Sequence, residues 1–189
     1  MRSFACPAPI AAAFVIFLQC AASCAAAPIE LPARRAGYWE IRVVHGASAG
    51  ASEMLLHACM DAATDKAMME AGTSAMQSLC SRREMTRDGD AYVWDAECTM
   101  GPLKTTSHVV IFGDFQGKYT MKMTSSVSGL PAAGSKGSTE TVMTQNAKWL
   151  AATCPEGVKP GDMQMPGGIT INASDMIKSR GVAATPWQP

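Results

Sequence analysis

Charged and aromatic side chains are scarce in this chain. Only 17% of its 189 residues are charged and 6% are aromatic, and 16 basic residues are balanced by 16 acidic ones. The leader described below contains Arg2 and no acidic residue, so the rest of the chain has a net charge of 15 − 16 = −1. This balance gives no sign of a basic face, and we expect no nucleic-acid partner and no attraction to an anionic lipid surface.

The chain also lacks an apolar run of the ~20 residues that a membrane-spanning helix needs. Its nearest candidate, "AAAFVIFL", lies within the first 27 residues, which begin with Arg2 and end in small residues. This is the layout of a secretory signal peptide, so we expect residues 1–27 to be a leader and the protein to be periplasmic or secreted. Cleavage after Ala26 is favoured, because a cut after Ala27 would place Pro28 next. The competing interpretation is lipid anchoring at Cys24, although that site lacks the usual aliphatic residue three places earlier.

Closely spaced cysteine pairs are missing as well. Beyond the leader the cysteines are Cys59, Cys80, Cys98 and Cys154. Zinc sites usually draw ligands from cysteines two to four residues apart, and redox pairs use Cys-x-x-Cys, so neither kind of site is expected. An even number of cysteines in an exported protein instead predicts two disulfides.

The segment "CSRREMTRDGDAYVWDAEC" selects one of the three possible pairings. Asp88-Gly89 favours a tight hairpin turn, and the strand that follows places Cys98 on the same face as Trp94. A two-residue loop at Asp88-Gly89 would leave Cys80 and Cys98 one residue out of register. A three-residue loop or one bulge restores the register. We therefore predict the disulfides Cys80–Cys98 and Cys59–Cys154.

Hydrophobic periodicity predicts the fold class. Alternating stretches such as "GYWEIRVVHG", "YTMKM" and "TETVMTQNAKWLAATC" indicate strands. The stretch 60–79 changes to a helical period, with the stripe Met60, Ala63, Ala67, Ala71, Ala75 and Leu79. We predict a mainly-β α+β domain over residues 37–178: a curved antiparallel sheet of about six strands with one inserted amphipathic helix. Residues 28–36 would form a linker and residues 179–189 a flexible tail.

The order of these motifs resembles a known family. "GYWE", a cysteine before a helical segment, a cysteine-bracketed hairpin with "VW", "YTMKM", "KWLAATC" and "KPGDMQMP" follow one another. This order is similar to the bacterial envelope family called domain of unknown function 3617, over roughly residues 37–176. The resemblance implies a small, cysteine-containing protein that is exported or lipid-anchored, with no assigned activity and no catalytic residue to carry over.

Methionine is abundant, with 14 residues in the chain. Met121 and Met123 share a strand face with Tyr119, and a second pair occurs at Met163 and Met165. Same-facing thioethers suit Cu(I), while packing in an irregular core is the interpretation that we favour. If the curved sheet encloses a cavity, the protein could instead carry an apolar ligand. The ligand-facing candidates are then Trp39, Tyr119, Met121 and Met123.

Catalytic signals are weak. "GASAG" matches the Gly-x-Ser-x-Gly pattern at Ser48, but the chain shows no β-α-β alternation around it. His45, His57 and His108 are scattered singly, unlike a metal-ligand cluster. We expect no catalytic residue, no metal and no cofactor. The sequence therefore predicts a non-enzymatic envelope protein with a binding or structural role, whose partner is an envelope protein or a small apolar ligand.

Overall fold

The computed structural model describes residues 29–46, 51–129 and 139–179. The predicted signal peptide, Cys24, Ser48 and residues 180–189 of the predicted tail lie outside these ranges. Within the described ranges, no helix combines the length and the apolar character that crossing a bilayer requires.

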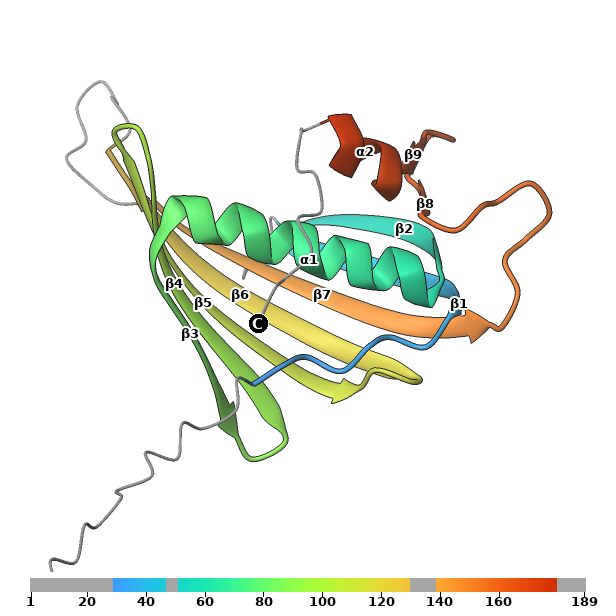
Figure 1. Cartoon of the computed structure of the whole chain (residues 1–189), viewed down its shortest axis with the longest axis horizontal. Coiled ribbons are helices and arrows are strands. Elements are labelled where there is room, and N and C mark those ends of the chain that lie inside the picture. Colours follow the sequence, from blue (N-terminus) through green and yellow to red (C-terminus); the bar gives the residue numbers. More distant parts are fainter. Residues whose placement is uncertain (1–28, 47–50, 130–138, 180–189) are drawn as a thin grey trace, which may run out of the picture.

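The described chain forms an open antiparallel sheet with two helices (Figure 1). Nine strands follow the order β3-β4-β5-β6-β7-β1-β2-β8-β9. This confirms the predicted mainly-β α+β class, with nine strands where about six were expected. The elements are β1 (Gly37–His45), β2 (Ser52–Met60), α1 (Ala62–Leu79), β3 (Cys80–Asp88), β4 (Ala91–Met100), β5 (Leu103–Asp114), β6 (Lys118–Ser128), β7 (Thr139–Ala151), β8 (Asp162–Gln164), β9 (Thr170–Asn172) and α2 (Ala173–Ser179).

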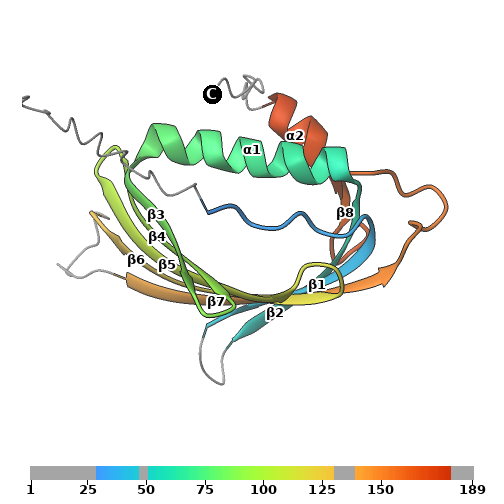
Figure 2. The same ribbon diagram turned by 60° about the horizontal axis from the view of Figure 1, so that its bottom comes forward.

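Helix α1 lies across the concave face of the curved sheet (Figures 1 and 2). It connects β2 to β3, which are separated by five other strands in the sheet order. Six strand spacings measure about 29 Å on a flat sheet. The 18-residue helix is about 27 Å long. The helix is therefore nearly as long as the distance between β2 and β3. The curvature of the sheet brings these two strands close enough for the helix to connect them.

The inner face of α1 differs from the predicted alanine stripe. Thr64 and Asp65, in the first turn, are its buried residues. Ala63 and Ala75 are exposed, and Leu79 is 41% exposed. The stripe was partly right, since Met60 is buried and Ala67 and Ala71 are partly buried. It missed Asp65, which turns inward to pair with an arginine far away in the sequence, and helical periodicity cannot reveal such a pair.

The hairpin β3–β4 contains a bulge, one of the two predicted alternatives, and corrects the predicted turn. The turn consists of Gly89 and Asp90, one residue later than expected, and Gly89 has φ 57°. This left-handed conformation is the one that tight hairpin turns require. A bulge between Cys80 and Arg82 then places Cys80 opposite Cys98. The two disulfides are those predicted, Cys80–Cys98 and Cys59–Cys154.

The two disulfides flank α1. Cys59 lies two residues before the N-cap residue Asp61, and Cys80 is the C-cap. The Asp61 carboxylate accepts a hydrogen bond from the backbone N–H of Thr64 at 2.7 Å, and hydrogen bonding to Thr64 lowers the pKa of Asp61 below its ordinary value. Covalent bonds thus fix both ends of the helix above the sheet, although its middle is exposed.

Candidate functional site: the concave face of the sheet

Strand register sorts the side chains of the concave face into rows that cross the sheet. Paired residues of neighbouring strands point to the same face, so each row follows from the pairing. Two rows, which we call the open rows, are Trp94–Val109–Met123–Met143–His45–Ser52 and Tyr92–Ile111–Met121–Gln145–Val43–Met54. The two adjacent rows, which we call the closed rows, are Tyr119–Ala147–Ile41–Leu56 and Trp149–Trp39–Ala58.

The closed rows are filled by the protein's own core. Trp39 is 1% exposed and Tyr119 is 8% exposed. Their rings lie 5.9 Å apart, and the ring of Phe115 stacks on Tyr119 at 5.0 Å. Trp39 and Tyr119, two of the ligand-facing candidates, therefore lie in intramolecular packing.

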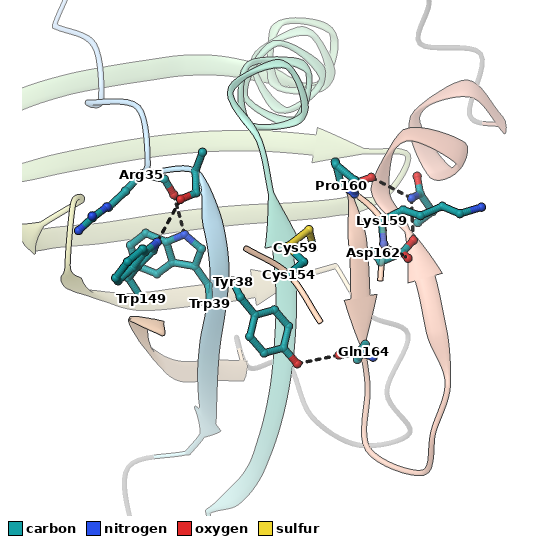
Figure 3. The surroundings of a disulfide bond; sticks show 12 residues. Arg35, Tyr38, Trp39, Cys59, Trp149, Cys154, Lys159, Pro160, Asp162 and Gln164 are labelled. Carbon is teal, nitrogen blue, oxygen red and sulfur yellow. Dashed lines mark hydrogen bonds between the residues drawn. A yellow bond between two sulfur atoms is a disulfide. The ribbon is translucent and has the colours of Figure 1, made fainter. Parts of the chain in front are cut away.

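Residues 29–36, which we call the N-terminal strap, run beside α1 on the concave side of the sheet (Figures 1 and 2). The N–H of Arg35 donates to the carbonyl of Phe115 at 3.0 Å. The indole N–H groups of Trp39 and Trp149 donate to the carbonyls of Arg35 and Ala36 at 2.8 and 3.1 Å (Figure 3). The guanidinium of Arg35 also stacks on Trp149, 3.8 Å from the ring centroid. The segment expected as a linker thus caps the closed rows.

A buried ion pair joins the strap to the first turn of α1. The backbone N–H and Nε of Arg34 donate to the two carboxylate oxygens of Asp65 at 3.0 and 2.6 Å. The side chains are 15% and 5% exposed. Burial acts to lower the pKa of Arg34, but attraction to the oxygens of Tyr119 and Asp65 outweighs it, and the pKa is raised. The pair keeps strap and helix together over the closed rows.

The open rows are covered less completely. Val109 and Ile111 are buried, whereas Trp94, Met123 and Met143 are only partly buried. Residues 72–75 of α1 are exposed, and the β3–β4 hairpin extends away from the helix (Figure 1). Apolar side chains that contact the core thus retain surface that a ligand could cover.

Met121 and Met123 lie where the sequence placed them, on the face of Tyr119. Both are partly buried and pack against the core. The pairing of β6 with β7 adds a third thioether, because Met143 lies directly opposite Met123. Met163 and Met165 also pack against the core, from β8 and the residue that follows it.

Asn172, the last residue of β9, has a structural role. The Asn172 side chain accepts a hydrogen bond from the N–H of Ser174 at 3.0 Å and donates to Asp162 at 2.8 Å. The latter bond, with that from the Lys159 N–H, lowers the pKa of Asp162. Asn172 thus joins β8 to the start of α2.

The histidines do not assemble into a site. His108 contacts Asp95 at 2.8 Å on the convex face, with the two side chains 55% and 41% exposed. His57 stacks on Tyr38 and lies 3.9 Å from Glu40, and His45 ends β1. Across the described ranges, no group of three or more His, Cys, Asp or Glu side chains has the arrangement of a metal site.

Sequence reasoning missed part of this face. Alternation along β7 could have identified Met143, which shares a face with Ala147 and Trp149. The pairing of Arg34 with Asp65 left no local signal, since 31 residues separate them. The strap was therefore not predictable from periodicity.

The fold and the two disulfides define a disulfide-bonded α+β domain in which a helix crosses a curved sheet. The family model described as protein of unknown function (DUF3617) matches residues 34–154, more than half of the chain. The chain belongs to this family, which confirms the resemblance seen in its motifs. No curated protein and no solved structure matches the chain.

Proposed function

We propose that this protein is an exported, non-enzymatic binding protein of the cell envelope that holds an apolar ligand on the open rows, beneath α1. The observation that carries the proposal is the partial burial of Trp94, Met123 and Met143 beside a fully packed core. Thioethers are flexible and polarizable, so they adapt to ligands of varied shape. Each Å² of apolar surface that a ligand covers there contributes about 25 cal/mol.

Two features support the export part of the proposal. The first 27 residues have the layout of a signal peptide, and the described domain contains two disulfides, which persist in oxidising compartments. The periplasm or the extracellular space would satisfy both. Intact mass measurement on protein from the envelope distinguishes a free N-terminus near residue 27 from a lipid-modified Cys24.

Binding is tested with a fluorescent apolar probe, N-phenyl-naphthylamine. The double variant Met123→Gln/Met143→Gln adds amides to the open rows, and we expect its affinity for the probe to fall about tenfold, equivalent to 1.4 kcal/mol. Lys122→Gln is the matched control, because Lys122 precedes Met123 and faces the opposite side of β6. Equal probe affinity in wild type, control and double variant would contradict the proposal.

A second candidate is Cu(I) binding by Met121, Met123 and Met143. The observation favouring it is the direct pairing of Met123 with Met143, which adds a thioether to the original pair. Replacing all three by leucine preserves apolar volume and removes sulfur. Copper transfer from a bicinchoninate complex to wild type but not to this variant, with probe binding retained, would support the copper function.

A further inference from the structure

We propose that the ligand of the open rows carries an anionic head group, which Arg83 and Arg87 of the edge strand β3 bind. This inference rests on the proposed function and adds the chemical class of the ligand: a single-chain amphiphile with a carboxylate or phosphate. The chain of the ligand would lie along the open rows, and its head would remain at the rim of the sheet.

The register of β3 places the two arginines beside the open rows. Met85 pairs with Trp94, so it extends that row to the sheet edge. Arg87 pairs with Tyr92 and Arg83 with Ala96, which puts both on the same face as Met85, about 7 Å to either side along the strand. The guanidinium of Arg87 stacks on Tyr92, 4.3 Å from the ring centroid, which holds it above this face.

The charges on the two faces of β3 differ in their pairing. On the convex face, Arg82 contacts Glu84 at 2.9 Å and Glu97 at 3.4 Å. All 16 acidic side chains of the sequence lie in the described ranges, and none forms an ion pair with Arg83 or Arg87. Charges on an edge strand deter strand pairing, but that role does not require two unpaired cations on one face.

The surroundings of Arg87 offer a place for a head group. Arg87 donates a hydrogen bond to the carbonyl of Gly89 at 3.4 Å, which leaves other guanidinium N–H groups available. A shallow depression adjoins it, lined by Pro32, Arg87, Asp90, Tyr92, Phe112, Gly113 and Phe115. Its members include one acidic side chain, Asp90, and two aromatic rings of the concave side, Tyr92 and Phe115, so an amphiphile finds apolar and cationic contacts together.

Guanidinium groups suit this task because they bind carboxylate and phosphate oxygens with paired hydrogen bonds. The overall charge balance does not report such a site, since Arg83 and Arg87 are surrounded in the sequence by Glu84, Asp88 and Asp90. Strand alternation and pairing separate the charges by face. The local cationic edge is thus compatible with a protein that has no basic surface as a whole.

Displacement of N-phenyl-naphthylamine by three ligands of equal chain length tests the inference: oleate, oleoyl lysophosphatidate and neutral oleyl alcohol. In wild type, we expect one or both anionic ligands to displace the probe at concentrations about tenfold or more below the alcohol, equivalent to at least 1.4 kcal/mol. The stronger of the two identifies carboxylate or phosphate as the head. Arg83→Gln/Arg87→Gln should abolish the preference, because it weakens the binding of the anionic ligands about tenfold more than that of the alcohol.

Arg82→Gln is the matched control, because it removes the same charge from the opposite face of the same strand. It should keep the preference for anionic ligands. Equal affinity of wild type for oleyl alcohol and both anions would overturn the anionic head group and leave the apolar site standing. If neither the probe nor any of the three ligands binds, the proposed function itself fails. A preference that survives in Arg83→Gln/Arg87→Gln would also contradict the assignment of these residues.

Discussion

The closed and open rows share one sheet face, yet they differ in what covers them. The strap and the first turn of α1 lie over the closed rows, and the buried pair Arg34–Asp65 ties them together. The open rows face the exposed middle of the helix and the projecting β3–β4 hairpin. The strand pairing continues through the closed and the open rows. The difference in their exposure therefore arises from the segments that lie above the sheet, and not from the sheet itself.

Side-chain chemistry follows the same division. In the closed rows the indole N–H groups of Trp39 and Trp149 donate to strap carbonyls, so rigid aromatic groups are fixed by hydrogen bonds as well as by packing. Met121, Met123 and Met143 of the open rows have no such constraint and can repack. One end of the face thus stabilises the domain, while the other retains adaptable apolar surface.

The largest loss of unfolding free energy should come from removing a disulfide. The loss should differ between the disulfides at the two ends of α1. Loss of Cys59–Cys154 by double alanine substitution opens a loop of 95 residues, and loop entropy predicts a loss of about 4.7 kcal/mol in unfolding free energy. Loss of Cys80–Cys98, which closes 18 residues, predicts about 3.2 kcal/mol. Urea denaturation measures both. A larger loss from the second disulfide would show that α1 depends mainly on its C-terminal attachment.

Two tryptophans provide a direct comparison of the rows. Trp39→Ala removes a side chain that is 1% exposed, and we expect a loss of about 4 kcal/mol in unfolding free energy. Trp94→Ala removes a partly buried side chain of an open row, so its loss should be about half as large, while probe affinity falls. Denaturation and probe titration on both variants check this. Similar stability losses with unchanged probe affinity for Trp94→Ala would erase the distinction between the rows.

Sequence-based prediction succeeded for features that local patterns encode and failed for the others. Alternation and turn chemistry predicted the sheet, the hairpin β3–β4 and the disulfide Cys80–Cys98, because each depends on residues that are close in sequence or on the parity of a strand. The disulfide Cys59–Cys154, whose cysteines are 95 residues apart, followed by elimination. Parity required either a three-residue loop or one bulge, and the structure places the bulge at Cys80 and the turn at Gly89 and Asp90. The short strands β8 and β9 were missed, since three-residue strands among glycines and prolines leave no periodic signal.

The candidate site was predicted less well than the fold. Met121 and Met123 were identified from their own strand, but whether an apolar face is filled or open depends on what packs above it. Trp39 and Met123 look alike as inward strand residues, and the strap together with the first turn of α1 separates their environments. Such contacts join distant segments, as Arg34 and Asp65 do, and no local pattern encodes them.

Breaking the buried ion pair Arg34–Asp65 should weaken the attachment of the strap to α1 above the closed rows. Asp65→Ala leaves the Arg34 guanidinium and its backbone N–H without their partner, and we expect a loss of about 3 kcal/mol in unfolding free energy. Glu70→Ala is the control, because its contact with Lys66 is exposed and its loss should stay below about 0.5 kcal/mol. Urea denaturation compares them, and hydrogen exchange of the strap locates the effect. Equal losses, or an unchanged strap, would remove the ion pair as the cause of closure.

The smallest effect on stability is expected from acid, which acts on β8 next to the closed rows. Gly161 donates its N–H to the carbonyl of Cys59, and the neighbouring Asp162 accepts hydrogen bonds from Asn172 and Lys159 that lower its pKa. A carboxyl whose folded pKa lies below its unfolded value of 3.8 stabilises the fold above that pH, and the contribution is lost as pH falls below 3.8 through the folded pKa. NMR titration of the Asn172 side-chain amide should therefore show a transition below pH 3.8 in wild type and none in Asp162→Asn. A transition retained in Asp162→Asn would mean that acid acts elsewhere, with Asp61, whose pKa is also lowered, the next carboxyl to substitute.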